Sequence, residues 1–156
     1  GLLAPMVHEP LNFVNTPALA RDRGLRVETA QTSESPDYTN LVVLRLDSAE
    51  GESVVSGTLV GPRHEPRLIE VLGFDMDVSP EKHMLFIRNE DMPGMIGKVG
   101  VTLGDHGINI GNMAVGRGEP GSRAAMAVTV DEPVSQEVID SLLAIPGFND
   151  ARAVTL

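Results

Sequence analysis

The pattern that most constrains the fold lies in residues 83–156, where strand-like and helix-like hydrophobic spacings alternate along the chain. Alternating apolar and polar residues are typical of a half-buried strand, whereas apolar residues three or four positions apart are typical of an amphipathic helix. The expected strands are 83–88, 108–116, 123–131 and 151–156. The first expected helix covers 93–106. The second begins after Ser135, the expected N-cap, and is ended by Pro146-Gly147. This β-α-β-β-α-β order predicts a ferredoxin-like arrangement, with both helices on one face of a single sheet.

The first 78 residues show a different pattern, one helix followed by several strands. The helix is expected over 12–23, entered at Thr16-Pro17 and ended by Gly24. The expected strands are 26–30, 38–47, 53–60 and 67–72. A polar, proline-containing segment, Asp75–Lys82, is the best boundary between the halves. The sequence therefore predicts an α+β protein of two small domains, 1–78 and 79–156.

Composition excludes several classes of function. The chain has no cysteine, so disulfides, thiolate nucleophiles and cysteine-bound metals are excluded. Its formal net charge of -10 argues against nucleic acid as a partner, because an acidic surface repels phosphate. Apolar runs such as Leu41–Leu44 fall far short of the roughly 20 residues that span a bilayer. We expect a cytoplasmic protein without membrane contact, and a fragment of a longer chain, since residue 1 is not Met.

No catalytic or metal-binding motif is found. Gly94, Gly97 and Gly100 fall inside the expected helix rather than before it, so they favour close helix packing over a phosphate-binding loop. The histidines are scattered, without the spacing of a metal-binding pair: His8, His64, His83 and His106. A strained G-x-S-x-G turn is also lacking. The sequence thus predicts neither catalytic residues nor a metal site.

A basic cluster follows Gly61-Pro62. Its members are Arg63, His64 and Arg67. An arginine fork can hold a phosphate or carboxylate, so this cluster is a candidate anion site. The alternative is that these are solvated turn charges, or partners of the protein's many carboxylates.

The segment Arg88–Ile110 offers a complementary group for each end of an amino acid. The Asp91 carboxylate suits an ammonium, and free backbone N–H groups at a helix N-terminus suit a carboxylate. The expected backbone donors are those of Gly94, Met95 and Ile96. Asn89 and Asn109 can both donate and accept hydrogen bonds. The alternatives are that Asp91 is only a helix cap and that Asn109 satisfies its own turn.

Specific motifs resemble a known family. "NEDMPGMIGKVG" followed by "HGINIGNM" resembles an ACT domain, an amino-acid-sensing module of metabolic enzymes. The whole chain is similar to the C-terminal part of the long-form D-3-phosphoglycerate dehydrogenases, in which an allosteric substrate-binding (intervening) domain precedes the ACT domain. The segments that carry this resemblance are "LNFVNTPALARDRGL", "DYTNLVVLRL", "VSGTLVG" and "HMLFIRNEDMPG".

This resemblance implies a regulatory role in L-serine biosynthesis. In that family L-serine binds between two ACT domains of a homo-oligomer, and the matching positions are Asn89, Asp91 and Asn109. The intervening domain of some members binds an anionic effector, for which the basic cluster is the candidate. The family's catalytic His and its Gly-rich NAD-binding fingerprint have no counterpart here, so NAD and catalysis would belong to the parent enzyme. Two alternatives stay open: a regulatory part of an iron–sulfur L-serine dehydratase, and an oligomerisation module without a ligand.

Overall fold

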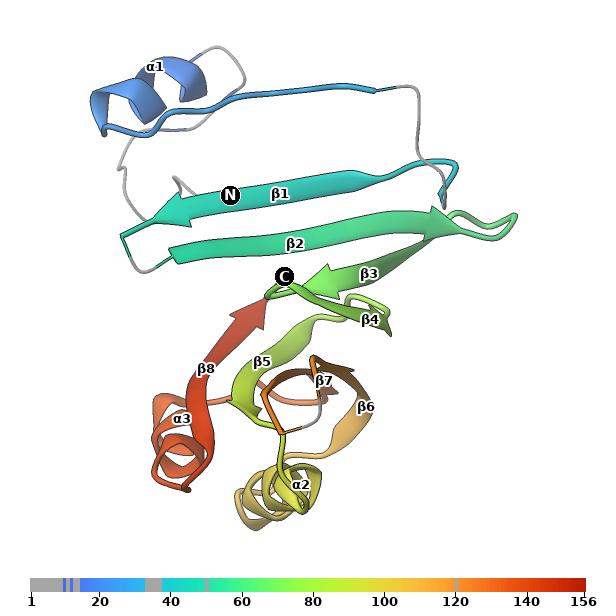
Figure 1. The fold of residues 1–156 in the computed structure, drawn as a ribbon, viewed down its shortest axis with the longest axis vertical. Coiled ribbons are helices and arrows are strands. Elements are labelled where there is room, and N and C mark those ends of the chain that lie inside the picture. Colours follow the sequence, from blue (N-terminus) through green and yellow to red (C-terminus); the bar gives the residue numbers. More distant parts are fainter. Residues whose placement is uncertain (1–9, 11, 13–14, 33–37, 50, 120) are drawn as a thin grey trace. The chain divides into compact units, whose positions relative to one another are not determined.

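The computed structural model describes residues 10, 12, 15–32, 38–49, 51–119 and 121–156 (Figure 1). The chain divides into two compact units, residues 1–35 and 36–156. The first unit contains α1 (Thr16–Asp22), which has proline in its first turn and is followed by Gly24 in the left-handed conformation. The strand expected at 26–30 is wrong: these residues form no strand, and all their side chains are exposed. Alternation alone does not make a strand where no neighbouring strand supplies hydrogen bonds.

The first sheet of the second unit is an antiparallel meander in the order β1-β2-β3-β4. Its strands are β1 (Val42–Ser48), β2 (Gly51–Val60), β3 (Glu65–Val71) and β4 (Phe74–Val78). The strand β4 corrects the reading of residues 75–78 as part of an irregular boundary. Leu72 and Gly73, both with positive φ, form a two-residue hairpin turn that folds β4 back on β3. Leucine is rare at the first position of such a turn, so Gly73 was its only turn signal in the sequence.

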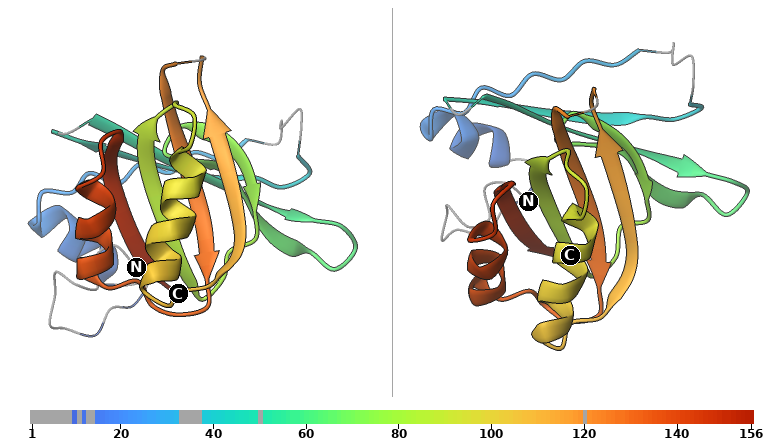
Figure 2. Two further views of the ribbon diagram at one scale, coloured as in Figure 1. Left: turned by 90° about the horizontal axis from the view of Figure 1, so that it is seen from below. Right: turned by 60° about the horizontal axis from the view of Figure 1, so that its bottom comes forward.

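The second sheet has the order β6-β7-β5-β8 and is antiparallel throughout. Its elements are β5 (His83–Glu90), α2 (Met95–Asp105), β6 (Ile110–Arg117), β7 (Arg123–Val130), α3 (Gln136–Leu143) and β8 (Phe148–Thr155). Both helices cover the same face of this sheet (Figure 2). The predicted α+β class and β-α-β-β-α-β order are therefore confirmed, although β8 begins three residues earlier than expected. Ser135 caps α3 as predicted, since its side chain accepts a hydrogen bond from Val138 N–H.

Apolar side chains fill both faces of the second sheet. Between the sheet and the helices lies the larger core, which includes Leu85, Ile87, Val99, Leu103, Met126, Val128, Val138 and Leu142. A smaller cluster on the opposite face joins Val71, Met76 and Val78 to Met84, Ala125 and Ala127. The strands β3 and β4 of the first sheet thus pack on the second one. This contact explains why residues 124–130 of β7 are all buried.

The glycines around α2 do not have the packing role that the sequence predicted. Gly94 does not lie inside α2 but precedes it as the N-cap, with φ of 89°. Gly97 and Gly100 lie inside α2, yet a Cβ added to either would meet no atom within 4 Å, so they do not serve close packing within the described part of the chain. A glycine that does allow close approach of backbone is Gly116 in β6, where a Cβ would lie 2.6 Å from the Cβ of Phe74 and 2.8 Å from the carbonyl oxygen of Asp75. No helix among the described residues is long and apolar enough to span a membrane.

Candidate functional site

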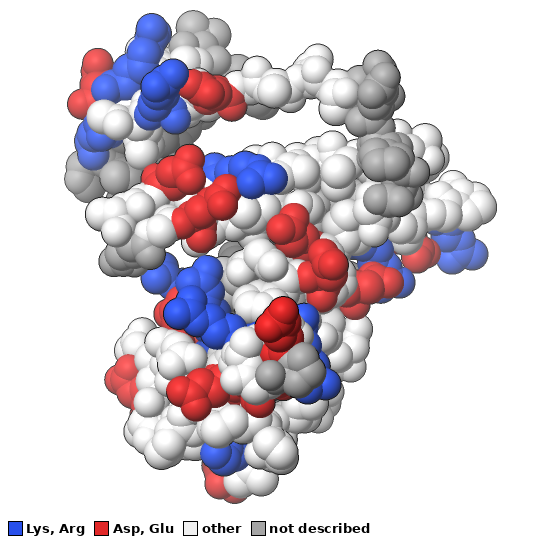
Figure 3. Space-filling model, in the orientation of Figure 1, with Lys and Arg blue, Asp and Glu red and all other residues white. Residues whose placement is uncertain are grey.

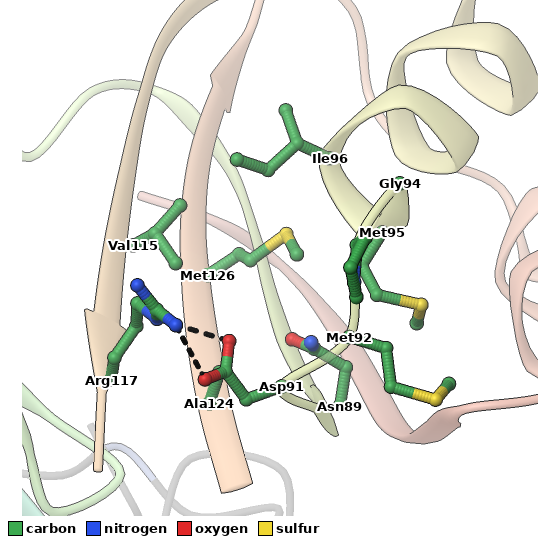
Figure 4. Close-up of a pocket in the computed structure, with 11 residues that line it drawn as sticks. Asn89, Asp91, Met92, Gly94, Met95, Ile96, Val115, Arg117, Ala124 and Met126 are labelled. Carbon is green, nitrogen blue, oxygen red and sulfur yellow. Dashed lines mark hydrogen bonds and ion pairs between the residues drawn. The ribbon is translucent and has the colours of Figure 1, made fainter. Parts of the chain in front are cut away.

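A pocket of about 310 Å³ opens beside the N-terminus of α2 (Figure 4). The end of β5, the loop into α2, and the facing ends of β6 and β7 surround it. Its lining residues are Asn89, Asp91, Met92, Pro93, Gly94, Met95, Ile96, Val115, Arg117, Ala124 and Met126. Five of the six positions predicted for the amino-acid site therefore lie around this one pocket.

Strand register creates the floor of the pocket. Asn89 of β5 pairs with Ala124 of β7, which pairs in turn with Arg117 of β6. Neighbouring strands are about 4.8 Å apart, so these three side chains form one row across the sheet. The central residue of the row is alanine, and its single methyl group leaves a hollow between the two longer polar side chains.

Backbone hydrogen bonds hold the loop above this floor. The N–H of Glu90 donates to the carbonyl oxygen of Gly147 at 2.8 Å, and that of Asp91 donates to the carbonyl oxygen of Ser122 at 3.1 Å. The N–H of Met92 turns back to the carbonyl oxygen of Glu90 at 2.9 Å. The loop is thus tied to the segments before β7 and β8. These ties place the Asp91 side chain over the row of Asn89, Ala124 and Arg117.

Asp91 forms a bidentate ion pair with Arg117. The Nε and Nη2 atoms of Arg117 donate to the two carboxylate oxygens of Asp91, at 3.0 and 2.7 Å, and Gly121 N–H adds a longer bond of 3.4 Å. The hydrogen bonds from Arg117 lower the pKa of Asp91 below its ordinary value, so the side chain is a carboxylate at neutral pH. The same contact raises the pKa of Arg117. Asp91 does not cap α2: among the described residues, no side chain forms a hydrogen bond to that N-terminus.

Asn89 carries an unsatisfied acceptor. Its side chain is 2% exposed, and its Nδ2 donates to the carbonyl oxygen of Glu90 at 2.7 Å. Because a carbonyl oxygen can only accept, this bond determines which end of the amide is nitrogen. The Oδ1 atom has no hydrogen-bond partner among the described residues, and Figure 4 shows it pointing into the pocket beside Asp91. A buried acceptor without a donor is costly, so the pocket favours a ligand that supplies one.

The N-terminus of α2 supplies the opposite polarity. The first hydrogen bond of the helix runs from Lys98 N–H to the carbonyl oxygen of Gly94 at 3.0 Å. In the described part of the chain the N–H groups of Gly94, Met95 and Ile96 have no acceptor, and no side chain caps the helix. Unpaired N–H groups at the positive end of the helix dipole attract an anion such as a carboxylate. The pocket therefore combines acceptors on its floor with donors on its helix side.

The remaining walls are apolar. They are formed by the side chains of Met92, Met95, Ile96, Val115 and Met126. Methionine side chains adapt to the shape of a ligand because they are unbranched and flexible. Such walls suit the aliphatic part of a small molecule whose charged groups face Asp91, Asn89 and the helix.

Asn109 is not part of this pocket. It lies beyond the C-terminal end of α2, whereas Asp91 lies before the N-terminal end. Its Nδ2 donates to the Oδ2 atom of Asp131 at 2.9 Å, and its side chain is exposed. Within one chain the structure does not bring Asn109 to Asp91. A role for Asn109 in the same site requires a second copy of the chain.

The basic cluster lies in the hairpin between β2 and β3. Arg63 and His64 occupy its exposed turn, where His64 has a φ of 53°. Arg67 lies in β3 and forms an ion pair with Asp77 of β4 at 3.4 Å. Arg67 is therefore paired with a carboxylate of the protein itself in this structure. No group of three or more His, Asp or Glu side chains among the described residues is placed to hold a metal ion.

Arg117 is the charged pocket residue that sequence reasoning missed. The expected strand ended at residue 116, but Arg117 is the last residue of β6. Val115 and Arg117 lie two positions apart and therefore share one face of the strand. The only local signal was this spacing. That Arg117 meets Asp91, in the loop after β5, is known only once the strand order β6-β7-β5 is known.

Comparison with known proteins agrees with this fold. The ACT domain family matches residues 83–147, and the intervening domain of D-3-phosphoglycerate dehydrogenase matches residues 1–72. The second sheet with its two helices and its pocket is thus an ACT domain, an α+β module. Over its whole length the chain is similar to D-3-phosphoglycerate dehydrogenases, and it matches their intervening and ACT domain models in turn.

Relatives from distant organisms share this region. The D-3-phosphoglycerate dehydrogenase of Methanocaldococcus jannaschii is 36% identical over the whole chain, which covers 29% of that protein. Those of Synechocystis and Bacillus subtilis are 35% and 31% identical over the whole chain, which covers 28% and 30% of them. The chain therefore spans less than a third of the length of these relatives.

Proposed function

We propose that this chain is the regulatory part of a D-3-phosphoglycerate dehydrogenase and that its ACT domain binds L-serine. The observation that carries the proposal is the pocket in which the orphan Oδ1 of Asn89 and the Asp91 carboxylate face the uncapped N-terminus of α2. Opposite polarities on two sides of one small pocket suit a zwitterion. Neither a simple amine nor a simple acid would satisfy both sides.

Each group of an amino acid then has a partner. The ammonium lies against Asp91 and Asn89 Oδ1, and the carboxylate accepts from the N–H groups of Gly94, Met95 and Ile96. The apolar wall contacts the Cβ atom. A volume of about 310 Å³ is at the low end of small-molecule sites, yet it exceeds what one serine fills. The remaining space is available to water and to a facing subunit.

The edge of the ACT sheet offers the surface for that second subunit. The strand β6 is an edge strand, and residues 110–116 include neither Lys nor Pro to prevent pairing with another strand. Antiparallel pairing of two β6 strands about a two-fold axis beside Met113 would place Asn109 of the partner subunit near Arg117. Asn109 would thereby reach the pocket from the partner. The proposed assembly is a homodimer or a larger homo-oligomer.

Catalysis lies outside this chain in our proposal. The parent enzyme would be an NAD-dependent oxidoreductase of L-serine biosynthesis in the cytoplasm, with this chain as its allosteric part. Figure 3 shows acidic side chains interspersed with basic ones on the face it presents, an arrangement that does not favour nucleic acid. Division at residues 78 and 79 into an intervening and an ACT domain is part of the same proposal. So is an anion site at Arg63, His64 and Arg67, which would require Arg67 to leave Asp77.

Calorimetric titration of the chain with L-serine, glycine and L-alanine tests the central proposal. Asp91→Ala removes a charged partner and should weaken serine binding roughly ten- to hundred-fold. Asn89→Ala should weaken it less, because one neutral acceptor is lost. The control is Asp150→Ala in β8, a carboxylate in an ion pair with Arg152 that does not line the pocket. Binding heat that is absent for all three amino acids, with no rise in melting temperature, would contradict the sensor role.

A further inference from the structure

The Asp91 carboxylate is already occupied by a cation of the same chain. Both of its oxygens accept from the guanidinium of Arg117, at 3.0 and 2.7 Å, and one also accepts from Gly121 N–H at 3.4 Å. An ionised carboxylate offers about four lone-pair sites, so few acceptor directions are left for another donor. An incoming ammonium needs the same oxygens that the guanidinium holds.

We propose that Arg117 is an internal competitor for the amino-acid site, and that the ligand ammonium must displace its guanidinium from Asp91. This inference rests on the proposed amino-acid binding and adds a residue that determines its strength and its specificity. The Arg117 side chain acts as a latch that holds the Asp91 carboxylate when no amino acid is bound. The exchange is neutral in charge, because one cation leaves Asp91 as another arrives.

Exposure decides which member of the pair moves. The Asp91 side chain is 13% exposed, and the backbone on either side of it is hydrogen bonded, as Asp91 N–H is to the Ser122 carbonyl. The Arg117 side chain is 60% exposed and stands at the end of an edge strand. The guanidinium can therefore turn into water while Asp91 stays in place. Exposed ion pairs are weak, so an amino acid that also gains the helix N–H contacts can displace it.

The latch has a consequence for specificity. A ligand without an ammonium group gains nothing at Asp91 and leaves the ion pair closed. A ligand with an ammonium opens the pair and reaches both the carboxylate and Asn89 Oδ1. Arg117 thus reduces the affinity for every amino acid by a similar factor, and it leaves deaminated analogues unaffected. Had Arg117 been a grip for the ligand carboxylate, both kinds of ligand would depend on it.

The test compares Arg117→Gln with Arg152→Gln in the full chain. The control removes the same charge and an ion pair with Asp150 at 3.3 Å, but it lies outside the pocket. L-Serine and its deaminated counterpart 3-hydroxypropanoate are titrated into each protein by calorimetry or ligand-observed NMR. We expect Arg117→Gln to bind L-serine roughly two- to five-fold more tightly than the wild type, the range that a weak exposed ion pair allows. The affinity of Arg152→Gln for L-serine and the response of all three proteins to 3-hydroxypropanoate should stay at wild-type values.

Two outcomes overturn the proposal in distinguishable ways. If the wild type binds L-serine and Arg117→Gln binds it equally or more weakly, the latch is refuted and the sensor role stands. If no amino acid binds to any of the three proteins, the sensor role fails and the latch fails with it. NMR titration of the Asp91 carboxyl provides a readout that needs no ligand, because breaking the ion pair should raise its pKa in Arg117→Gln only. Equal melting temperatures of the variants show that each is folded. Arg117→Ala must also bind L-serine more tightly than the wild type does.

Discussion

Replacing Gly116 with Ala should destabilise the contact between the two sheets. A Cβ at this position would lie 2.6 Å from the Cβ of Phe74 and 2.8 Å from the carbonyl oxygen of Asp75. Both distances are far shorter than van der Waals contact, and the second atom belongs to the backbone of β4, which cannot rotate away. Overpacking of this kind typically costs about 1–3 kcal/mol of folding free energy. Since Gly116 adjoins Arg117, the same shift should also disturb the pocket.

Chemical and thermal denaturation measure this cost. A loss of about 2 kcal/mol corresponds to a fall in melting temperature of roughly 4–8 °C for a chain of this size. Gly97→Ala is the matched control, because a Cβ added at that position in α2 would meet no atom within 4 Å. It should raise stability by about 0.5–1 kcal/mol through the better helix propensity of alanine. Equal stability of the two variants would refute the packing of β4 on β6.

Three further predictions concern the site and its surroundings. Because its pKa is lowered in the folded state, Asp91 stabilises the fold at any pH above the ordinary carboxyl pKa. This contribution is lost as the pH falls through the lowered pKa of the folded state. Unfolding measured against pH should therefore show a smaller acid-dependent loss in Asp91→Asn than in the wild type, and identical profiles would contradict the ion pair. Ala124→Val fills the hollow in the row of side chains, so calorimetry should show weaker serine binding with the charges unchanged; unaltered affinity would place the ligand elsewhere. Asn109→Ala should reduce the serine-dependent shift in dimer dissociation measured by sedimentation, and an unchanged shift would remove Asn109 from the shared site.

Much of the ACT half was predictable because its signals are local. Helical spacing in residues 93–106 and alternation in the flanking strands come from neighbours within one or two turns, and the structure has the same elements in the same order. The first half was less predictable. The segment 26–30 alternates but forms no strand, whereas β4 forms from a short segment with two aspartates, because β3 and the second sheet supply its partners. Strand formation depends on such non-local partners more than helix formation does.

The candidate site likewise has one part that was predictable from local sequence and another that depends on tertiary structure. Asn89, Asp91 and the first residues of α2 lie within eight positions of one another, so the sequence by itself was enough to group them as one polar cradle. That serine binds there stays a prediction. The ion pair with Arg117 and the hollow over Ala124 were decided only by tertiary structure, since both depend on the strand order β6-β7-β5 and on its register. Side-chain type and spacing determine which groups a segment can offer, but which groups of distant segments meet is determined by how the strands pair.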